Sequence, residues 1–333
     1  MSEFTIRDLA PDDAAALSDL FVRCYGHTYG SPVFYDVPAL RTLIQEGALR
    51  SVVVGDDTGL VGHTGITIRH AHALVCETGN TVVDPRSRGQ GLLRKLGGAL
   101  RRRVIREGFS GYVHYPTTAH DIMQRASVNG GGVETGVMLA YVGQTTEYKA
   151  IDRKAADRGA GRLAATVAYQ PFSEVPAREV VLPEKYRDLL TGMYTHAGLE
   201  RAVASGVHSC GSLQPTELTC AKHRERGLLS IVLSRTGRDL VPRVNALVRE
   251  HAPVVTHADL PLDDPHIDTA VEGLNALGFF FCALLPEFAR TDMLRLQNLH
   301  APEPGDFAPH VINEQARVFC EIMRRDARGQ YSP

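Results

Sequence analysis

The order of hydrophobic and polar positions predicts alternating strands and helices over the first 142 residues. Short runs rich in apolar and β-branched residues are typical of strands, and they occur at 4–8, 50–54, 59–68, 73–83, 111–115 and 137–142. Leu93, Leu96, Leu100 and Val104 recur at spacings of three and four, which predicts a helix directly after the preceding loop. Two further helices are expected after Pro11 and over 118–128. The first half is therefore predicted to be a mixed α/β domain, a central mixed β-sheet flanked by helices.

The second half repeats this kind of pattern after a polar stretch at 143–161, which has no apolar period and suits a linker. Strands are predicted at 162–169, 227–233, 254–257, 279–285 and 290–297, and helices at 184–197, 239–250 and 267–277. This order echoes the closing elements of the first half, which indicates a divergent internal duplication. The chain is expected to comprise a first domain at 1–145, a linker at 146–160, a second α/β domain at 161–300 and a C-terminal helical tail at 301–333.

Composition and charge exclude several classes of protein. Of the 333 residues, 44% are apolar and 22% are charged, which excludes disordered, collagen-like and coiled-coil chains. The net charge of −2 provides no overall field that would favour nucleic acid or a membrane as a partner. The N-terminal residues lack the apolar core of a signal peptide, and no run reaches the roughly 18 apolar residues of a membrane helix. A cytoplasmic location is therefore expected.

The cysteines and histidines do not form a recognisable metal or disulfide pattern. The six cysteines are scattered without a C-x-x-C pair, and the fourteen histidines include no H-x-x-x-H pair. We expect reduced thiols and no metal.

The number of subunits stays open between a monomer and a homodimer.

The loop at 86–91 (RSRGQG) lies between a predicted strand and a predicted helix. Successive backbone N–H groups and the positive end of the helix dipole can hold a phosphate at such a point. Gly89 and Gly91 would let the main chain approach a pyrophosphate closely, and Arg88 adds positive charge. The loop lacks the Gly-Lys-Ser/Thr ending of the phosphate-binding loop in nucleoside triphosphatases, and it lacks the G-x-G-x-x-G pattern of dinucleotide-binding folds. Binding of ATP or NAD is therefore disfavoured. On these residues alone, a simple turn that precedes an exposed basic helix is the alternative.

The string TVVDPRSRGQGLLRKL resembles the coenzyme A loop of the GNAT (N-acetyltransferase) superfamily. That pattern is a strand ending in valine, then proline, then Arg/Gln-x-x-Gly-x-Gly/Ala at the start of a helix. The matching positions here are Val83, Pro85, Arg86, Gly89 and Gly91. The resemblance extends over 4–142, because the order strand, helix, three strands, loop, helix, strand, helix, strand is the order of that fold.

The resemblance implies that acetyl-CoA or another acyl-CoA is a co-substrate. The amides from Arg88 to Leu92 would bind the pyrophosphate, and the main chain of Val82 and Val83 would pair with the pantetheine arm like an added strand. The irregularity at Gly79-Asn80 fits the bulge with which such folds splay two strands. The basic face of the helix, which includes Lys95, would reach the 3′-phosphate of the adenosine, unless that face is simply solvated. The implied cofactor-binding residues are Val82, Val83, Arg86, Arg88, Gly89, Gln90, Gly91, Leu92 and Lys95.

Acyl transfer to an amine needs a neutral amine, a route for its proton and a proton donor for the leaving thiolate. The superfamily often keeps a carboxylate base on the fourth strand, and Glu77 occupies that place, although an ordinary acid on a strand face would look the same. His63 on the neighbouring strand and His120 near the start of the later helix are further candidates for catalysis. Ser127 stands where many members carry the tyrosine that protonates the thiolate, so the general acid is unassigned.

An aromatic segment follows the first helix. Tyr25, Tyr29 and Tyr35 lie where such folds cover the acceptor pocket, and rings with one polar group suit the walls of that pocket. We expect these tyrosines to bind the acceptor. Cys24 is expected to be buried filler, because no base is evident that would make it a nucleophile.

The second half also resembles part of a GNAT domain, namely the closing helix, a Gly-Phe turn at Gly278-Phe279 and two strands. No loop of the coenzyme A pattern follows residue 151. The resemblance therefore implies a tandem protein whose second GNAT-like domain is degenerate. This domain either forms a wall of the acceptor site or serves as a structural partner only.

These resemblances together imply an acyl-CoA-dependent N-acyltransferase. It would acylate a small amine or amino-acid-like acceptor by direct transfer in a ternary complex. Two alternatives stay open: a non-catalytic coenzyme A-binding sensor or partner protein, and an enzyme of the same fold that performs O-acylation or thioester decarboxylation.

Overall fold

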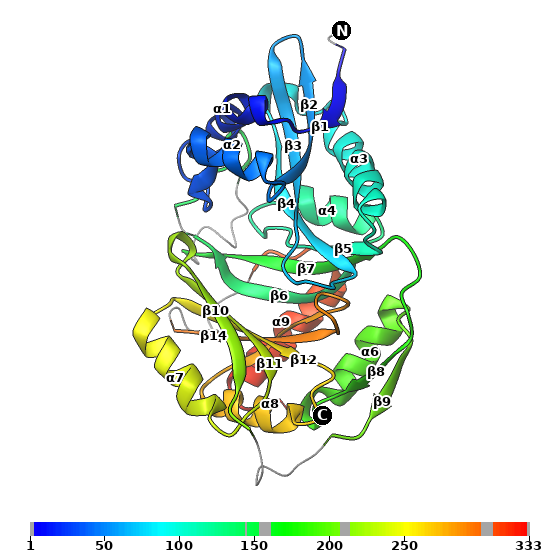
Figure 1. The fold of residues 1–333 in the computed structure, drawn as a ribbon, viewed down its shortest axis with the longest axis vertical. Helices are drawn as coiled ribbons and strands as arrows, with labels where there is room; N and C mark the ends of the chain where they lie inside the picture. Colours follow the sequence, from blue (N-terminus) through cyan, green and yellow to red (C-terminus); the bar gives the residue numbers. More distant parts are fainter. Residues whose placement is uncertain (1–2, 144, 153–160, 207–213, 301–308, 332–333) are drawn as a thin grey trace.

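The computed structural model describes residues 3–143, 145–152, 161–206, 214–300 and 309–331 (Figure 1). In the first half the elements are β1 (Thr5–Asp8), α1 (Ala14–Tyr25), α2 (Val37–Gln45), β2 (Arg50–Asp56), β3 (Gly59–Thr67), β4 (Val75–Val83), α3 (Leu92–Arg106), β5 (Gly111–His114), α4 (Asp121–Asn129) and β6 (Val133–Val142). This is the predicted order of elements, with α2 added.

The second half follows with a comparable series. Its elements are β7 (Leu163–Pro171), β8 (Arg178–Val181), α6 (Arg187–Ala197), β9 (Arg201–Ala204), β10 (Glu217–His223), β11 (Leu228–Arg235), α7 (Leu240–His251), β12 (Val255–Pro261), α8 (Ile267–Ala276), β13 (Phe280–Leu285), β14 (Met293–Leu299) and α9 (Glu314–Ala327). The helix predicted within the C-terminal tail is α9. Residues 153–160 of the predicted linker, 301–308 of the tail and Cys210 lie outside the described residues.

A single sheet of 12 strands runs through both halves in the order β1-β2-β3-β4-β5-β7-β6-β13-β14-β12-β11-β10. The order β3-β4-β5-β7-β6 is mirrored by β10-β11-β12-β14-β13, so that β6 and β13 meet at the seam between the halves. Each half contains one pair of parallel strands that is connected through a helix. In the first half α3 connects β4 with β5, and in the second half α7 connects β11 with β12. The mixed α/β fold class is confirmed, and this mirrored order is the one expected of a duplicated chain.

Strand β7 pairs with β5 on one side and with β6 on the other. The sequence interpretation assigned this segment to the start of the second domain. In the sheet it lies among first-half strands, because the chain leaves β6 through the polar stretch and returns to the same sheet. The domain limits themselves stay a prediction.

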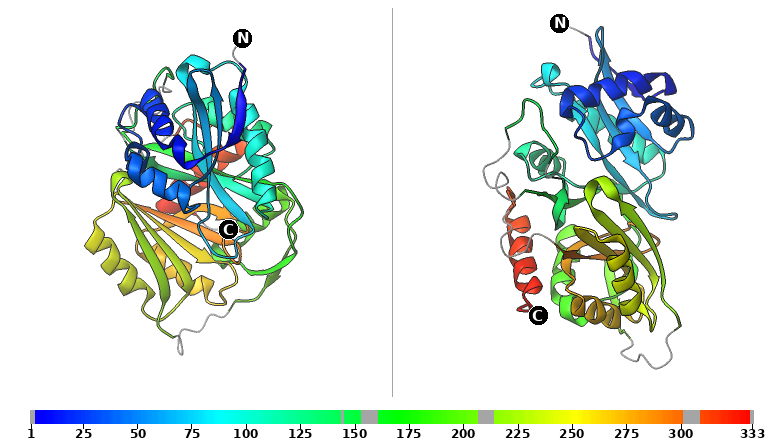
Figure 2. Two further views of the ribbon diagram at one scale, coloured as in Figure 1. Left: turned by 45° about the horizontal axis from the view of Figure 1, so that its top comes forward. Right: turned by 90° about the vertical axis from the view of Figure 1, so that its left-hand side faces the viewer.

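Both faces of the first-half sheet are covered by helices (Figures 1 and 2). Val53 packs into the cluster under α1 and α2, whereas Val52 and Val54 pack into the cluster under α3. Neighbouring strand residues point to opposite faces, so this run of three valines is buried throughout. On α3 three of the four predicted apolar positions are buried, among them Leu96, which is 0% exposed. The fourth, Leu93, is only partly buried, and Leu92 is buried at this turn instead.

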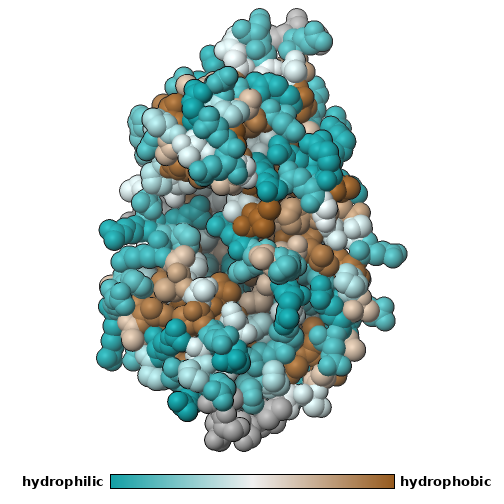
Figure 3. Space-filling model, in the orientation of Figure 1, coloured by the Kyte–Doolittle hydropathy of each residue, from teal (hydrophilic) through white to brown (hydrophobic). Residues whose placement is uncertain are grey.

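Helix α9 covers the seam between the halves. Phe319 and Met323 on this helix are buried, and Gln297 of β14 donates a hydrogen bond to the main-chain oxygen of Val137 on β6. These contacts bind the halves into one packed core. On the face seen in Figure 3, hydrophilic residues dominate and apolar residues form separate small patches. Within the described residues, no helix has the length and apolar character needed to cross a membrane.

Candidate functional site

A cavity of about 520 Å³ opens where β4 and β5 separate. The two strands pair only over Val75–Thr78 and Gly111–His114, whereas β4 continues to Val83. The edge of β4 that would face β5 is therefore unpaired over its last five residues, and those residues line the cavity. An unpaired strand edge offers main-chain N–H and C=O groups to an extended ligand.

A β-bulge in β4 accompanies this separation. His63 lies opposite Val82 and Gly65 lies opposite Gly79, so β4 has one residue more than β3 over this interval. Asn80 adopts a left-handed conformation with φ of 55°. The predicted irregularity at Gly79-Asn80 is therefore present as a bulge, and it lies on the wall of the cavity.

The loop after β4 presents main-chain amides to the same cavity. Gly89 and Gly91 have φ values of 78° and 71°, which only glycine adopts at low cost. Gly91 is the N-cap of α3, and it provides no side-chain hydrogen bond to the first turn. The N–H groups of that turn are thus open to an anion.

Six of the nine predicted cofactor residues line the cavity: Val82, Val83, Arg88, Gly89, Gly91 and Leu92. Arg88 also holds the surrounding chain, since its Nε donates to the Val83 oxygen (3.2 Å) and its Nη1 donates to the Lys149 oxygen (2.7 Å). The other three, which the structure does not bring to the cavity, are Arg86, Gln90 and Lys95.

Arg86 and Lys95 have other contacts. Arg86 pairs with the buried Asp84 at 2.9 Å and so fixes the turn that leads into the loop. The ammonium of Lys95 lies 5.6 Å from the centre of the Phe4 ring. Both residues therefore have structural roles within the described part of the chain, and the site that we build below does not use them.

The corresponding loop of the second half, between β11 and α7, has no such free amides. The N–H of Thr236 donates to Asp264 (2.6 Å), and the N–H of Arg238 donates to the main-chain oxygen of Gln214 (3.2 Å). A Cβ added to Gly237 would overlap the backbone of Gln214 and of Thr216. The chain itself fills the position that a pyrophosphate would take, which gives a physical reason for the degeneracy expected of this half.

Glu77 lies toward the other end of the cavity, on the wall formed by β4. Its two carboxylate oxygens accept hydrogen bonds from Arg69 at 2.8 and 2.7 Å. Burial raises the pKa of Glu77, but the charge and hydrogen bonds of Arg69 outweigh burial and leave the pKa below its ordinary value. Glu77 is therefore an anion at neutral pH.

His120 lines the cavity, whereas His63 does not. His63 is fully buried, and its ring nitrogens bind the Asn80 oxygen (2.7 Å) and the Ser51 hydroxyl (2.9 Å). Burial lowers the pKa of each histidine to about 4, so both rings are neutral at pH 7. The Nδ1 of His120 is buried and has no hydrogen-bond partner within the described residues.

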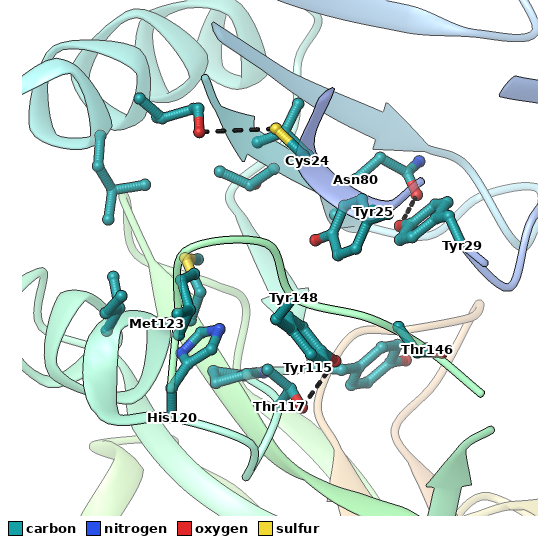
Figure 4. Close-up of a pocket in the computed structure, with 18 of the residues that line it drawn as sticks. Cys24, Tyr25, Tyr29, Asn80, Tyr115, Thr117, His120, Met123, Thr146 and Tyr148 are labelled. Carbon is teal, nitrogen blue, oxygen red and sulfur yellow. Dashed lines mark hydrogen bonds between the residues drawn. The ribbon is translucent and has the colours of Figure 1, made fainter. Parts of the chain in front are cut away.

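Of the three tyrosines predicted to bind the acceptor, two line the cavity and one does not. Tyr25 and Tyr29 line the cavity, and Tyr29 donates a hydrogen bond to the side-chain oxygen of Asn80 at 2.7 Å (Figure 4). Tyr35 does not line it; its hydroxyl instead accepts a hydrogen bond from the Tyr29 N–H at 3.0 Å. Asn80 and Tyr35 thus hold Tyr29, and the ring of Tyr25 lies 4.7 Å from that of Tyr29, which fixes that wall.

Residues of the predicted linker also cover the cavity. Tyr148 lies between α1 and α4 in Figure 4, with its ring 5.6 Å from that of Tyr25 and its hydroxyl 3.3 Å from that of Thr117. The Lys149 N–H donates to the Cys24 oxygen, which attaches the segment to the end of α1. The polar composition of this segment gave no sign of such a role.

Cys24, expected to be buried filler, and Ser127, at the position where the general acid is unassigned, carry no reactive group. Burial raises the pKa of the Cys24 thiol to about 11, so it is protonated and a poor nucleophile at neutral pH. Ser127 is buried and hydrogen-bonded to His114 at 2.8 Å, and it does not line the cavity. Among the described residues there is no cluster of three metal-ligating side chains.

Three solved structures illustrate what this chain is similar to. An N-acetyltransferase from Staphylococcus aureus Mu50 is 13% identical, with a TM-score of 0.41 over 52% of this chain and 100% of its own. A putative acetyltransferase from Salmonella typhimurium, solved with acetyl-CoA, is 18% identical, with a TM-score of 0.40 over 53% of this chain and 97% of its own. The ribosomal-protein-S18-alanine N-acetyltransferase from Escherichia coli is 15% identical, with a TM-score of 0.40 over 52% of this chain and 97% of its own.

No protein-family model matches the chain, and no curated protein matches it in sequence. Similarity at such identities and TM-scores does not decide an activity. The function is therefore inferred from the residues of this chain.

Proposed function

We propose that this protein is an acyl-CoA-dependent N-acyltransferase, with acetyl-CoA as the simplest donor and a small amine or amino-acid-like molecule as the acceptor. The observation that carries the proposal is the continuity of one cavity. Open amides at the start of α3, the unpaired edge of β4 and the carboxylate of Glu77 all line it. These features suit, in order, a pyrophosphate, an extended amide-containing arm and an amine.

The spacing along β4 agrees with this arrangement. Glu77 and Val83 are six residues apart on one strand, which corresponds to about 20 Å. A donor anchored by its phosphates at the loop would therefore present its thioester toward Glu77. The amine nitrogen attacks the thioester carbonyl, the C–S bond breaks, and the departing thiolate takes up a proton.

We assign Glu77 to the amine and His120 to the thioester. Glu77 is an anion that attracts the acceptor nitrogen, which attacks as the neutral amine, and it accepts the proton that this nitrogen releases as the C–N bond forms. The low pKa of Glu77 makes it a weak base, so part of its contribution is electrostatic. His120 is neutral and lines the cavity, so its ring can form a hydrogen bond with the reacting group.

A coenzyme A-binding sensor is the second candidate, favoured by two specific observations. Ser127 replaces the expected tyrosine, and both oxygens of Glu77 already accept hydrogen bonds from Arg69. In such a protein the loop would bind its ligand without turnover. An O-acyltransferase or a thioester decarboxylase on the same fold would use the same loop with a different acceptor or none.

Incubation with a panel of acyl-CoAs and amines tests the proposal, with free thiol and product mass as the readouts. An N-acyltransferase releases thiol only when an amine is present, and the amine gains the mass of the acyl group. Tight coenzyme A binding without thiol release for any amine favours the sensor. Thiol release with hydroxyl acceptors, or loss of carbon dioxide from a carboxylated acyl-CoA, would instead identify the other two reactions.

A further inference from the structure

Three arginines act on the charge of Glu77, and only two of them are paired with a carboxylate of the described residues. Arg69 is paired with Glu77, and the buried Arg295 is paired with Asp259 at 2.6 and 2.8 Å. Arg226 also lines the cavity, and it forms no salt bridge with any carboxylate of the described residues. Its charge is therefore unbalanced at this place.

The position of Arg226 is fixed by contacts with the first half. Its Nη1 donates to the Tyr141 hydroxyl at 2.6 Å, and the guanidinium lies 5.1 Å from the centre of that ring. Its main-chain oxygen accepts a hydrogen bond from Arg162, and its side chain lies 3.7 Å from the position of a Cβ on Gly30. The contact with the Tyr141 hydroxyl and ring orients the guanidinium without pairing it with a carboxylate.

Arg226 comes from the second half of the chain. It ends the short turn between β10 and β11, and this hairpin extends up to the first half (Figures 1 and 2). Gly227, which follows it, has φ of 55°, so the turn reverses directly behind the arginine. The degenerate half thus contributes a cation to the cavity of the other half.

The donor phosphates are not the natural partner of this cation. Arg226 is anchored at Tyr141 and beside Gly30, both of which line the cavity, and within the described residues it has no hydrogen bond, ion pair or ring contact with the loop at 86–91. The Nε and Nη2 groups of Arg226 have no hydrogen-bond partner in the part of the chain that the structure describes. An arginine with unused N–H groups is suited to bind a carboxylate.

We infer that Arg226 binds a carboxylate of the acceptor, so that the acceptor is an amino acid or a close relative rather than a simple amine. Glu77 and Arg226 then recognise the ammonium and the carboxylate of one molecule. This inference rests on the proposed function and narrows it. It also gives the second half a role in substrate recognition.

The test compares carboxylate-bearing acceptors with amines that differ only by loss of the carboxylate. The probes are the protein amino acids, together with histamine, tyramine and cadaverine as the partners of histidine, tyrosine and lysine. They are assayed on the full chain with acetyl-CoA, and their binding is measured by calorimetry in the presence of coenzyme A. Arg226→Ala and Arg226→Lys are compared with Arg224→Ala, which changes an exposed arginine of the same turn.

For Arg226→Ala we expect KM for an amino acid to rise about 10- to 100-fold, from the loss of charge-assisted hydrogen bonds. KM for acetyl-CoA stays unchanged in Arg226→Ala. For Arg226→Lys we expect a KM for the amino acid between those of the unchanged protein and Arg226→Ala. Arg224→Ala should have the same KM values as the unchanged protein. Amines without a carboxylate bind weakly and are insensitive to Arg226→Ala.

Two results overturn the inference. One is an amine that is bound as tightly as its amino acid partner, and the other is an Arg226→Ala variant that binds amino acids normally. Failure of the proposed function is a separate result, because then no probe is acylated although coenzyme A binds. The calorimetric comparison of amino acid with amine still decides the role of Arg226 in that case.

Discussion

Replacing Gly91 by aspartate would place a carboxylate where the pyrophosphate is proposed to bind. Gly91 is the N-cap of α3 with φ of 71°, and no described atom lies within 4 Å of a Cβ built there. The side chain is therefore accommodated without a clash. A non-glycine residue in this conformation costs about 1–2 kcal/mol, and an aspartate N-cap returns only about a few tenths of a kcal/mol relative to glycine. The net loss of about 1–2 kcal/mol is small enough for the variant to stay folded.

The same carboxylate opposes the donor in two ways. It accepts the N–H groups of the first turn, and each lost hydrogen bond to a charged group costs about 1.5–3 kcal/mol. It also repels the phosphates by about 1 kcal/mol per charge pair at 4 Å in water, and by more where water is excluded. One lost hydrogen bond and one or two repulsions amount to about 3 kcal/mol, which lowers the affinity for coenzyme A at least about 100-fold.

Calorimetric titration with coenzyme A measures this loss directly. Gly91→Asn provides a cap without charge and should bind more tightly than Gly91→Asp. Gly108→Asp is the matched control, since Gly108 also has a positive φ, of 87°, and open space around its Cα, but lies at the other end of α3. Undiminished affinity in Gly91→Asp would refute the placement of the phosphates. Equal losses in the Gly108 control would show general damage instead.

Three further predictions concern catalysis, packing and pH. Glu77→Gln should lower kcat about 10²- to 10⁴-fold while KM for acyl-CoA stays constant, in steady-state assays. Leu96→Ala removes a side chain that is 0% exposed, and denaturant unfolding should show a loss of about 2–5 kcal/mol. Burial lowers the pKa of His63, His114 and His120 to about 4, lowers the pKa of His257 well below its ordinary value, and raises the pKa of Glu134 to about 7. Between pH 6.5 and 4.5 the unfolded chain thus binds four protons that these folded histidines exclude, and it lacks the one that folded Glu134 retains. This net excess of three protons in the unfolded chain makes stability fall by about 4 kcal/mol per pH unit on acidification.

Each of these predictions has a result that contradicts it. Full turnover in Glu77→Gln removes this residue from the mechanism, and the thermal midpoint of that variant separates lost chemistry from lost folding around Arg69. A loss below 1 kcal/mol in Leu96→Ala would mean that α3 does not pack as described. Stability that is constant or rises as the pH falls from 6.5 would show that the buried histidines are not held neutral.

Local patterns were sufficient to predict the conformation of the loop at 86–91 and its surroundings. The apolar positions Leu96, Leu100 and Val104 on α3 are buried as expected, and the left-handed glycines are at Gly89 and Gly91. These features depend on residues close together in the sequence. The bulge at Asn80 could also be predicted, because a Gly-Asn pair is unusual inside a strand.

Elements with weak patterns were missed. Helix α2 buries only Leu40 and Ile44, so its apolar face is too small to be distinguished from a loop. Strand β10 lies at the edge of the sheet with mostly exposed side chains, and it therefore lacks the alternation that a half-buried strand shows.

The acceptor end of the cavity could not be predicted from local sequence. Tyr141 and Arg226 are 85 residues apart, and they meet only because β7 inserts beside β6 and the β10–β11 hairpin reaches across to the first half. Tyr148 lies in a segment whose composition is that of a linker. His63 was expected near the chemistry but is turned into the core, where Ser51 and Asn80 satisfy both ring nitrogens.

The most direct measurement of the central claim is a crystal structure of the full chain grown with coenzyme A. The account predicts the pyrophosphate on the amides that follow Arg88 and the pantetheine arm beside the unpaired edge of β4, with its sulfur directed toward Glu77. Ligand density elsewhere on the molecule, with nothing bound at Gly89 and Gly91, would contradict it.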